Sequence, residues 1–383
     1  MRKFGLLLLL FFVFFYSCVE PYNSKSINYQ NLLVVEGFIS TDMKQHQVAI
    51  STTSPIGNPE FIPETGAEVS IKEEGSVIPL TEGTPGLYLT PPLQGVVGKT
   101  YQLFITTKSG RQLLSEEITL KDNPGIKNVY ASYSPHVSAL NNEGGFQIFL
   151  DAKDSTGQAL FYRWEYEETW EIRTPFESNY YWVGGNDVLF RSTPVSTCYG
   201  SDTTSNVLIQ STQGLSEDKV ESKLIQTIPR ESLKLQFLYS MLVRQYTLSA
   251  KAFLYWQALL KTNQTQGSLS DVQPGTVFGN ISSSTDKELV LGYFDACVVK
   301  EKRIFIEPLK FRSSGFTPTE FEAGCKFLEF TVVPVYGIGA FFSKPENSNM
   351  EILGASGGAL FLLPKQCCDC TSLGTTLKPS FWP

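Results

Sequence analysis

The chain has 383 residues, a net charge of −7 and a pI near 5.2, and no block of basic residues interrupts it. These properties argue against a nucleic-acid partner, because phosphate recognition needs clustered Lys and Arg. With 42% hydrophobic and 18% charged residues the chain can bury a sizeable core, and its length suggests at least two domains.

The first eighteen residues have the layout of a secretory signal peptide. Arg2 and Lys3 precede an unbroken apolar run at 4–16, and Ser17 and Cys18 follow it. The run is shorter than the roughly 20 apolar residues that span a bilayer. The Ser-Cys pair resembles a bacterial lipoprotein signal, and that resemblance implies removal of residues 1–17 and lipidation of Cys18. An ordinary secreted protein that is cut nearby is the alternative.

Residues 18–31 are polar and show no periodicity, so we predict a lipid-anchored tether. From 32 to 122, short strand-like runs alternate with turn signals about every ten residues. This pattern predicts an antiparallel β-sandwich of the prealbumin or immunoglobulin-like kind. Asp-Asn-Pro-Gly at 122–125 is the predicted boundary. A larger β-rich domain with one amphipathic helix is expected over 125–383.

Residues 161–172 alternate between aromatic and charged side chains, which is typical of a long half-buried strand. The charged face of this strand is expected to be solvated, and binding of a ligand to it is the alternative. The aromatic side chains of this strand and of the segment after it are expected to be core residues, and a ligand surface is the alternative. The residues of that candidate surface are Trp164, Trp170, Tyr180, Tyr181 and Trp182.

The helix is predicted over 250–263, with Ser249 as its N-cap. Its apolar residues recur at helical spacing on one face, which indicates packing against a sheet. Strands are expected to resume after it, including 288–294, 296–306 and 340–343.

Without Cys18, six of the seven cysteines remain, and an exported chain is expected to pair them in disulfides. Residues 367–370 could also be interpreted as a metal knuckle, but no histidine lies near them, so we predict no metal and no other cofactor. The candidates for disulfide pairing are Cys198, Cys297, Cys325, Cys367, Cys368 and Cys370.

Catalytic motifs are scarce. The two histidines, His46 and His136, have no nucleophile motif beside them, so we expect both on the surface. We therefore predict a protein that is not an enzyme. A glycoside hydrolase would need two carboxylates about 5 to 10 Å apart. The first residues to consider for that alternative are Glu165, Glu167, Glu168 and Glu171.

Four parts of the sequence resemble the Bacteroidota lipoproteins catalogued as domain of unknown function 4249. They are the opening strand 33–39, the segments 66–71 and 98–103, the block from 253 to 294, and the C-terminal segments 367–370 and 378–382. The resemblance implies an outer-membrane lipoprotein encoded alongside TonB-dependent transporters. We expect a surface-exposed, non-catalytic binding or accessory partner of such a transporter, with a carbohydrate or peptide as ligand. A cell-surface adhesion or polysaccharide-binding structural protein is the alternative.

Two three-residue motifs are similar to O-glycosylation sites of exported Bacteroidota proteins. They are Asp154-Ser155-Thr156 and Asp202-Thr203-Thr204. The resemblance implies modification of Ser155 and Thr203, in exposed loops.

Overall fold

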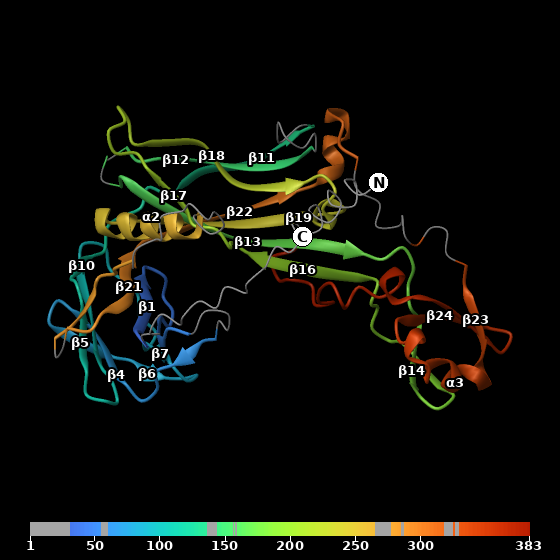
Figure 1. Ribbon diagram of the computed structural model, residues 1–383. Coiled ribbons are helices and arrows are strands. Elements are labelled where there is room, and N and C mark those ends of the chain that lie inside the picture. Colours follow the sequence, from blue (N-terminus) through green and yellow to red (C-terminus); the bar gives the residue numbers. More distant parts are fainter. Residues whose placement is uncertain are drawn as a thin grey trace, which may run out of the picture.

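The computed structural model describes residues 31–54, 60–135, 144–155, 157, 159–264, 277–284, 287–317, 325 and 329–383. Strands dominate the described residues, so the predicted mostly β fold class is confirmed. The strands form two β-sandwiches and a smaller five-stranded body (Figure 1). We call these bodies the first sandwich, the second sandwich and the third module.

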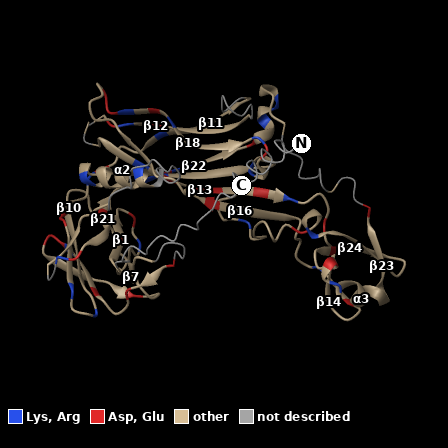
Figure 2. Cartoon of the chain, viewed as in Figure 1, with Lys and Arg blue, Asp and Glu red and all other residues tan. Residues whose placement is uncertain are grey.

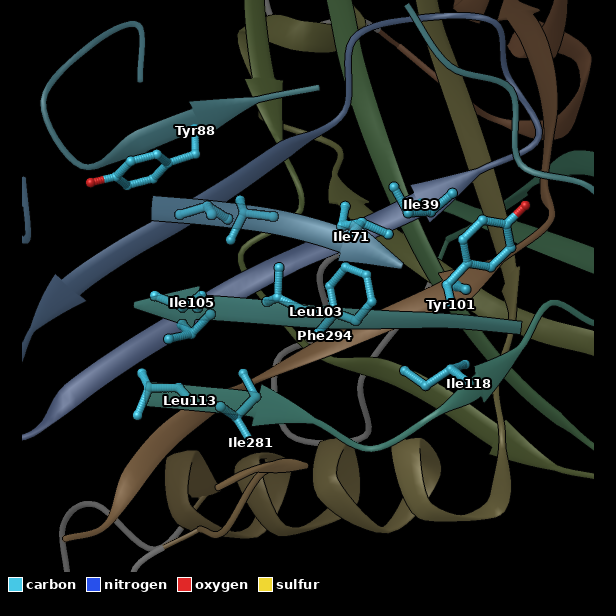
Figure 3. Close-up of a cluster of buried hydrophobic side chains, with 14 of the residues drawn as sticks. Ile39, Ile71, Tyr88, Tyr101, Leu103, Ile105, Leu113, Ile118, Ile281 and Phe294 are labelled. Carbon is cyan, nitrogen blue, oxygen red and sulfur yellow. The ribbon is translucent and has the colours of Figure 1, made fainter. Parts of the chain in front are cut away.

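The first sandwich has two six-stranded sheets. One contains β21 (Val290–Cys297), β1 (Leu33–Ser40), β2 (Gln47–Thr52), β7 (Leu87–Leu89), β6 (Thr81–Glu82) and β3 (Ile62–Pro63). The other contains β20 (Ile281–Ser283), β9 (Gln112–Ser115), β8 (Thr100–Thr106), β4 (Glu68–Glu73), β5 (Ser76–Pro79) and β10 (Ile118–Thr119). Alternate residues of both sheets meet in one core, which includes Ile39, Leu103 and Phe294 (Figure 3).

Two strands of this sandwich come from residues 281–297, far beyond the segment 32–122 in which the sequence predicts a sandwich. β21 runs parallel to β1, with Leu33 opposite Val290. Gly292 permits this pairing, because its φ is +94° and a Cβ there would lie 2.0 Å from the carbonyl oxygen of Val35. The sheet of β1 and β21 is therefore mixed, whereas the sequence predicts an antiparallel sandwich.

The second sandwich packs a three-stranded sheet on a five-stranded one. The smaller sheet contains β11 (Ile126–Ser134), β12 (Gly145–Lys153) and β18 (Lys219–Pro229). The larger contains β16 (Thr197–Thr203), β13 (Phe161–Arg173), β19 (Tyr239–Thr247), β22 (Val299–Ile306) and β17 (Leu208–Ser211). The even-numbered side chains at the start of β13 enter the shared core, as the alternation of aromatic and charged residues predicts.

Helix α2 (Ala250–Gln264) lies between the two sandwiches (Figure 1). It begins where the sequence predicts, and the backbone N–H of Ala252 donates to Ser249 Oγ at 3.1 Å. Ala252 is fully buried, and the ring of Phe253 lies 5.0 Å from that of Phe161 on β13. Among the described helices none is both long and apolar enough to cross a membrane.

The third module is a five-stranded antiparallel sheet with a short helix, α3 (Ile338–Phe342). Its strands, in order across the sheet, are β15 (Asp187–Phe190), β14 (Tyr180–Gly184), β24 (Met350–Ser356), β25 (Ala359–Pro364) and β23 (Thr331–Pro334). The predicted strand at 340–343 is wrong, because Phe341 and Phe342 belong to this helix and pack on the core of the module. A short apolar run does not distinguish a strand from a buried helical turn.

Short 3-10 helices complete the described structure. They are η1 (Leu233–Leu235), η2 (Pro308–Ser314), η4 (Val335–Gly337), η5 (Pro345–Asn347) and η6 (Lys365–Cys367).

Candidate functional site

The five aromatic residues of the predicted ligand surface lie in three separate places. Trp164 is 1% exposed in the core of the second sandwich, where its indole N–H donates to Gln245 Oε1 at 2.9 Å. Trp170 is half-buried farther along β13, and its ring lies over Gly200 on β16. Tyr180, Tyr181 and Trp182 lie on β14 of the third module. The structure therefore does not bring these five side chains together on one surface.

The charged face of β13 is covered at its start, where Arg163 and Glu165 lie under α2 and beside the first sandwich. Here the two sandwiches and the helix enclose a cavity of about 210 Å³. Its aromatic lining consists of Phe38, Tyr246, Tyr255, Trp256 and Tyr293. Its charged lining consists of Glu36, Arg163, Glu165 and Asp295. Ligand sites often occur at such junctions between domains.

Arg163 is held between two aromatic faces of this cavity. Its Cζ atom lies 4.2 Å from the ring centroid of Tyr246 and 4.3 Å from that of Trp256. The guanidinium also forms an ion pair with Glu165, whose other oxygen accepts from the Tyr246 hydroxyl at 2.6 Å. These contacts make the arginine a rigid part of the wall.

The same contacts set the protonation state of Glu165. Burial alone would raise the pKa of this carboxyl, but the charge of Arg163 and the hydrogen bonds from Tyr246 and Arg163 outweigh it. The pKa of Glu165 is therefore lowered, and the residue is anionic at neutral pH.

Asp295 comes from β21, on the opposite wall. Its Oδ1 atom accepts a hydrogen bond from the backbone N–H of Ala296 at 2.8 Å. Burial raises the pKa of Asp295 to about 6, against the opposing effects of this hydrogen bond and of Arg163. The parallel register places Phe38 beside Asp295 and Glu36 beside Tyr293, so β1 and β21 present these groups on one face.

Sequence reasoning missed this cavity, although two signals point to it. Asp295 is the one acidic residue of β21, an otherwise mostly apolar strand. Trp256 belongs to the helical face that the sequence assigns to the core, and it is only partly buried there. Neither signal reveals that the first and second sandwiches meet at α2.

Four of the six candidate cysteines form two disulfides, Cys198–Cys370 and Cys325–Cys367. The expectation that all six pair is wrong, because Cys297 and Cys368 are free. Cys297 lines the cavity, where burial raises the pKa of its thiol. Burial likewise raises the pKa of Cys368 to about 12. Cys367 and Cys370 are in disulfides, so their sulfurs are not available as the metal ligands that the alternative interpretation of residues 367–370 requires.

The four glutamates considered for glycoside hydrolysis already have partners, and they do not share one face of β13. Glu165 pairs with Arg163, Glu167 with Arg244, and Glu171 with Arg173. Glu168 points to the opposite side, is 1% exposed, and accepts from the Tyr239 hydroxyl at 2.6 Å. Its charge is balanced by Lys234.

His46 is not on the surface as the sequence predicts. It is 2% exposed, and its Nε2 lies 3.0 Å from the carbonyl oxygen of Leu93. Burial lowers the pKa of His46 below 6.5. His136 lies outside the described residues, as does Cys18.

The two residues of the predicted O-glycosylation sites, Ser155 and Thr203, are exposed. Thr203 ends the strand β16, however, so it does not lie in a loop.

No curated protein matches this chain. At the level of families, residues 19–303 match one described as Domain of unknown function (DUF4249). The match covers about three quarters of the chain, including the first sandwich, α2 and the cavity residues on β1, β13, β19 and β21. The protein therefore belongs to the DUF4249 family.

Proposed function

We propose that the protein is a lipid-anchored, outward-facing protein of the outer membrane that acts as a non-catalytic binding partner of a TonB-dependent transporter. The signal-like residues 1–17, with Cys18 after them, support the lipid anchor. The resemblance to Bacteroidota lipoproteins supports the location and the kind of partner. An exposed apolar hairpin supports docking to another protein.

The observation that carries the proposal is the outer face of the hairpin β14–β15 in the third module. Tyr181 pairs with Leu189 across the hairpin, and Val183 lies two positions farther along β14, at an irregularity in the pairing with β15. These side chains are 36%, 50% and 50% exposed, respectively. β15 is also the edge strand of its sheet. An apolar face on an exposed edge is typical of a surface that another chain covers.

The charge distribution around the hairpin agrees with a docking surface. Trp182 of β14 stacks on Phe342 of α3, a helix that Figure 2 draws without blue or red residues. Arg191 lies 5.3 Å from the centroid of the Tyr181 ring and pairs with Glu351. Aromatic and arginine side chains of this kind are enriched at the centre of protein interfaces.

A lipid tether strengthens such a contact. Anchoring confines the protein to the plane of the membrane, so its effective concentration beside a membrane partner is high. A weak docking contact through the hairpin can therefore persist.

The test combines mass spectrometry of Cys18 with co-purification from outer membranes. We expect an acylated Cys18 and a β-barrel transporter that co-purifies with the wild-type chain. Leu189→Asp places a charge in the apolar face beside Tyr181 and should abolish the co-purification. Val77→Asp is the matched control, because Val77 is 65% exposed on a strand of the first sandwich and should leave the partner bound.

Two results would refute the proposal. The first is an unmodified protein in the soluble fraction. The second is equal recovery of the transporter with Leu189→Asp and with the wild type. A deletion strain with normal nutrient uptake and altered attachment would instead favour the adhesion protein.

A further inference from the structure

The cavity between the sandwiches contains more negative than positive charge. Arg163 is the one cation among the described residues that line it, and Glu165 already neutralises it. Asp295 and Glu36 remain, and the ion pairs of the described residues include neither of them. Nearby Lys44 lies 5.8 Å from the Phe38 ring centroid and pairs with Asp42.

Asp295 has an acceptor available for a ligand. Its Oδ1 accepts from Ala296, and no described group donates to Oδ2. Burial makes the ionised carboxylate of Asp295 unfavourable, and Arg163, which is paired with Glu165, offsets only part of that cost. A bound cation with N–H donors would reduce it further.

Aromatic faces surround the same space. The rings of Tyr255 and Tyr293 lie 5.0 Å apart, and that of Trp256 lies 5.6 Å from Tyr255. Aromatic faces attract cations, and they bind alkyl chains equally well. With about 210 Å³, the cavity is smaller than the roughly 300 to 1,000 Å³ of sites for drug-sized molecules. The ligand is therefore small, or only the end of a larger molecule enters.

We propose that this cavity binds the ammonium group of a small primary amine, with the carboxylate of Asp295 as its anionic partner and the rings of Tyr255, Trp256 and Tyr293 around it. Glu36, beside Tyr293 in the register of β1 and β21, adds to the negative potential. The N–H donors of a primary ammonium match the free acceptor of Asp295, which a quaternary ammonium could not use. This site is independent of the docking hairpin, which lies in the third module.

The test is calorimetric titration of the purified full chain at neutral pH with two probes of equal size, butylamine and butanol. We expect saturable binding of butylamine and at least about tenfold weaker binding of butanol. Asp295→Asn keeps the shape and removes the charge, so it should weaken butylamine binding by at least about tenfold. Asp187→Asn is the matched control, because Asp187 is exposed in the third module and should leave the affinity unchanged.

Circular dichroism and thermal melting of both variants check that they are folded. The proposal is overturned if butylamine shows no saturable binding, if butanol binds equally well, or if Asp295→Asn retains the wild-type affinity.

Discussion

Asp295 makes the protein less stable at neutral pH than an isosteric neutral residue would. Burial raises the pKa of its carboxyl from 3.8 to about 6, so the unfolded chain ionises more readily than the folded one. Below pH 3.8 the carboxyl is protonated in both states and has no such cost. As the pH rises from 3.8 to 6 the unfolded state ionises before the folded state, so stability is lost, and the loss is complete once the folded state ionises as well. Asp295→Asn should therefore stabilise the protein at neutral pH.

The magnitude follows from the difference between the two pKa values. About 2.2 pKa units at 1.36 kcal/mol each give about 3 kcal/mol. Asp295 is half-buried, so solvent screening makes this an upper bound. The difference in the free energy of unfolding between Asp295→Asn and the wild type should be near zero at pH 4 or below, rise between pH 4 and 6, and stay constant above pH 6.

Urea unfolding, followed by tryptophan fluorescence from pH 4 to pH 8, measures this difference. The other residues that line the cavity are the same in both proteins, so the difference between the two reports on Asp295. Asp187→Asn, a substitution of the same kind at an exposed position of the third module, is the control. The reasoning is wrong if Asp295→Asn is less stable than the wild type at pH 7.5, or if the difference does not vary with pH.

Three further predictions concern stability. Replacing Cys198 and Cys370 by Ser opens a link across 172 residues, and loop entropy predicts a loss of up to about 5 kcal/mol in urea unfolding. Gly292→Ala should lower the free energy of unfolding by about 3 kcal/mol or more, because its Cβ would clash with the backbone of β1. Gly357 also has a positive φ, +58°, but open space around it, so Gly357→Ala should lower the free energy of unfolding by only about 1 kcal/mol. Thermal melting compares the two variants. Because burial lowers the pKa of His46, the unfolded chain takes up a proton at this histidine more readily than the folded protein, so stability that is present above pH 6.5 is lost as the pH falls. The melting temperature of His46→Gln should therefore depend less on pH between pH 7 and 5.

Local patterns in the sequence were sufficient to predict most of the strands and the helix. β13 follows the alternation of its aromatic and charged residues, and α2 begins directly after its Ser cap. Both signals depend on neighbours a few positions apart, which the sequence displays directly. The four residues at 340–343 show where such signals stop, because a run that short fits a helical turn as well as a strand.

The candidate site could not be predicted, because it depends on contacts between distant segments. Asp295, Arg163 and Trp256 come from three elements, and they meet only because β21 returns to the first sandwich. The predicted ligand surface on Trp164 and Trp182 treats residues that are near in sequence as neighbours in space. Trp164 lies in the core of the second sandwich because of strand alternation, whereas Trp182 lies in the third module.

The parallel pairing of β1 with β21 has a consequence for how the molecule acquires its shape. About 250 residues separate the two partners, so β1 is synthesised long before β21 is available to pair with it. Until then β1 has an open hydrogen-bonding edge, and its apolar side chains lack Phe294 as a neighbour. Maturation of this protein is therefore not a domain-by-domain process from the N-terminus, and a holding chaperone would be most useful while that edge is bare.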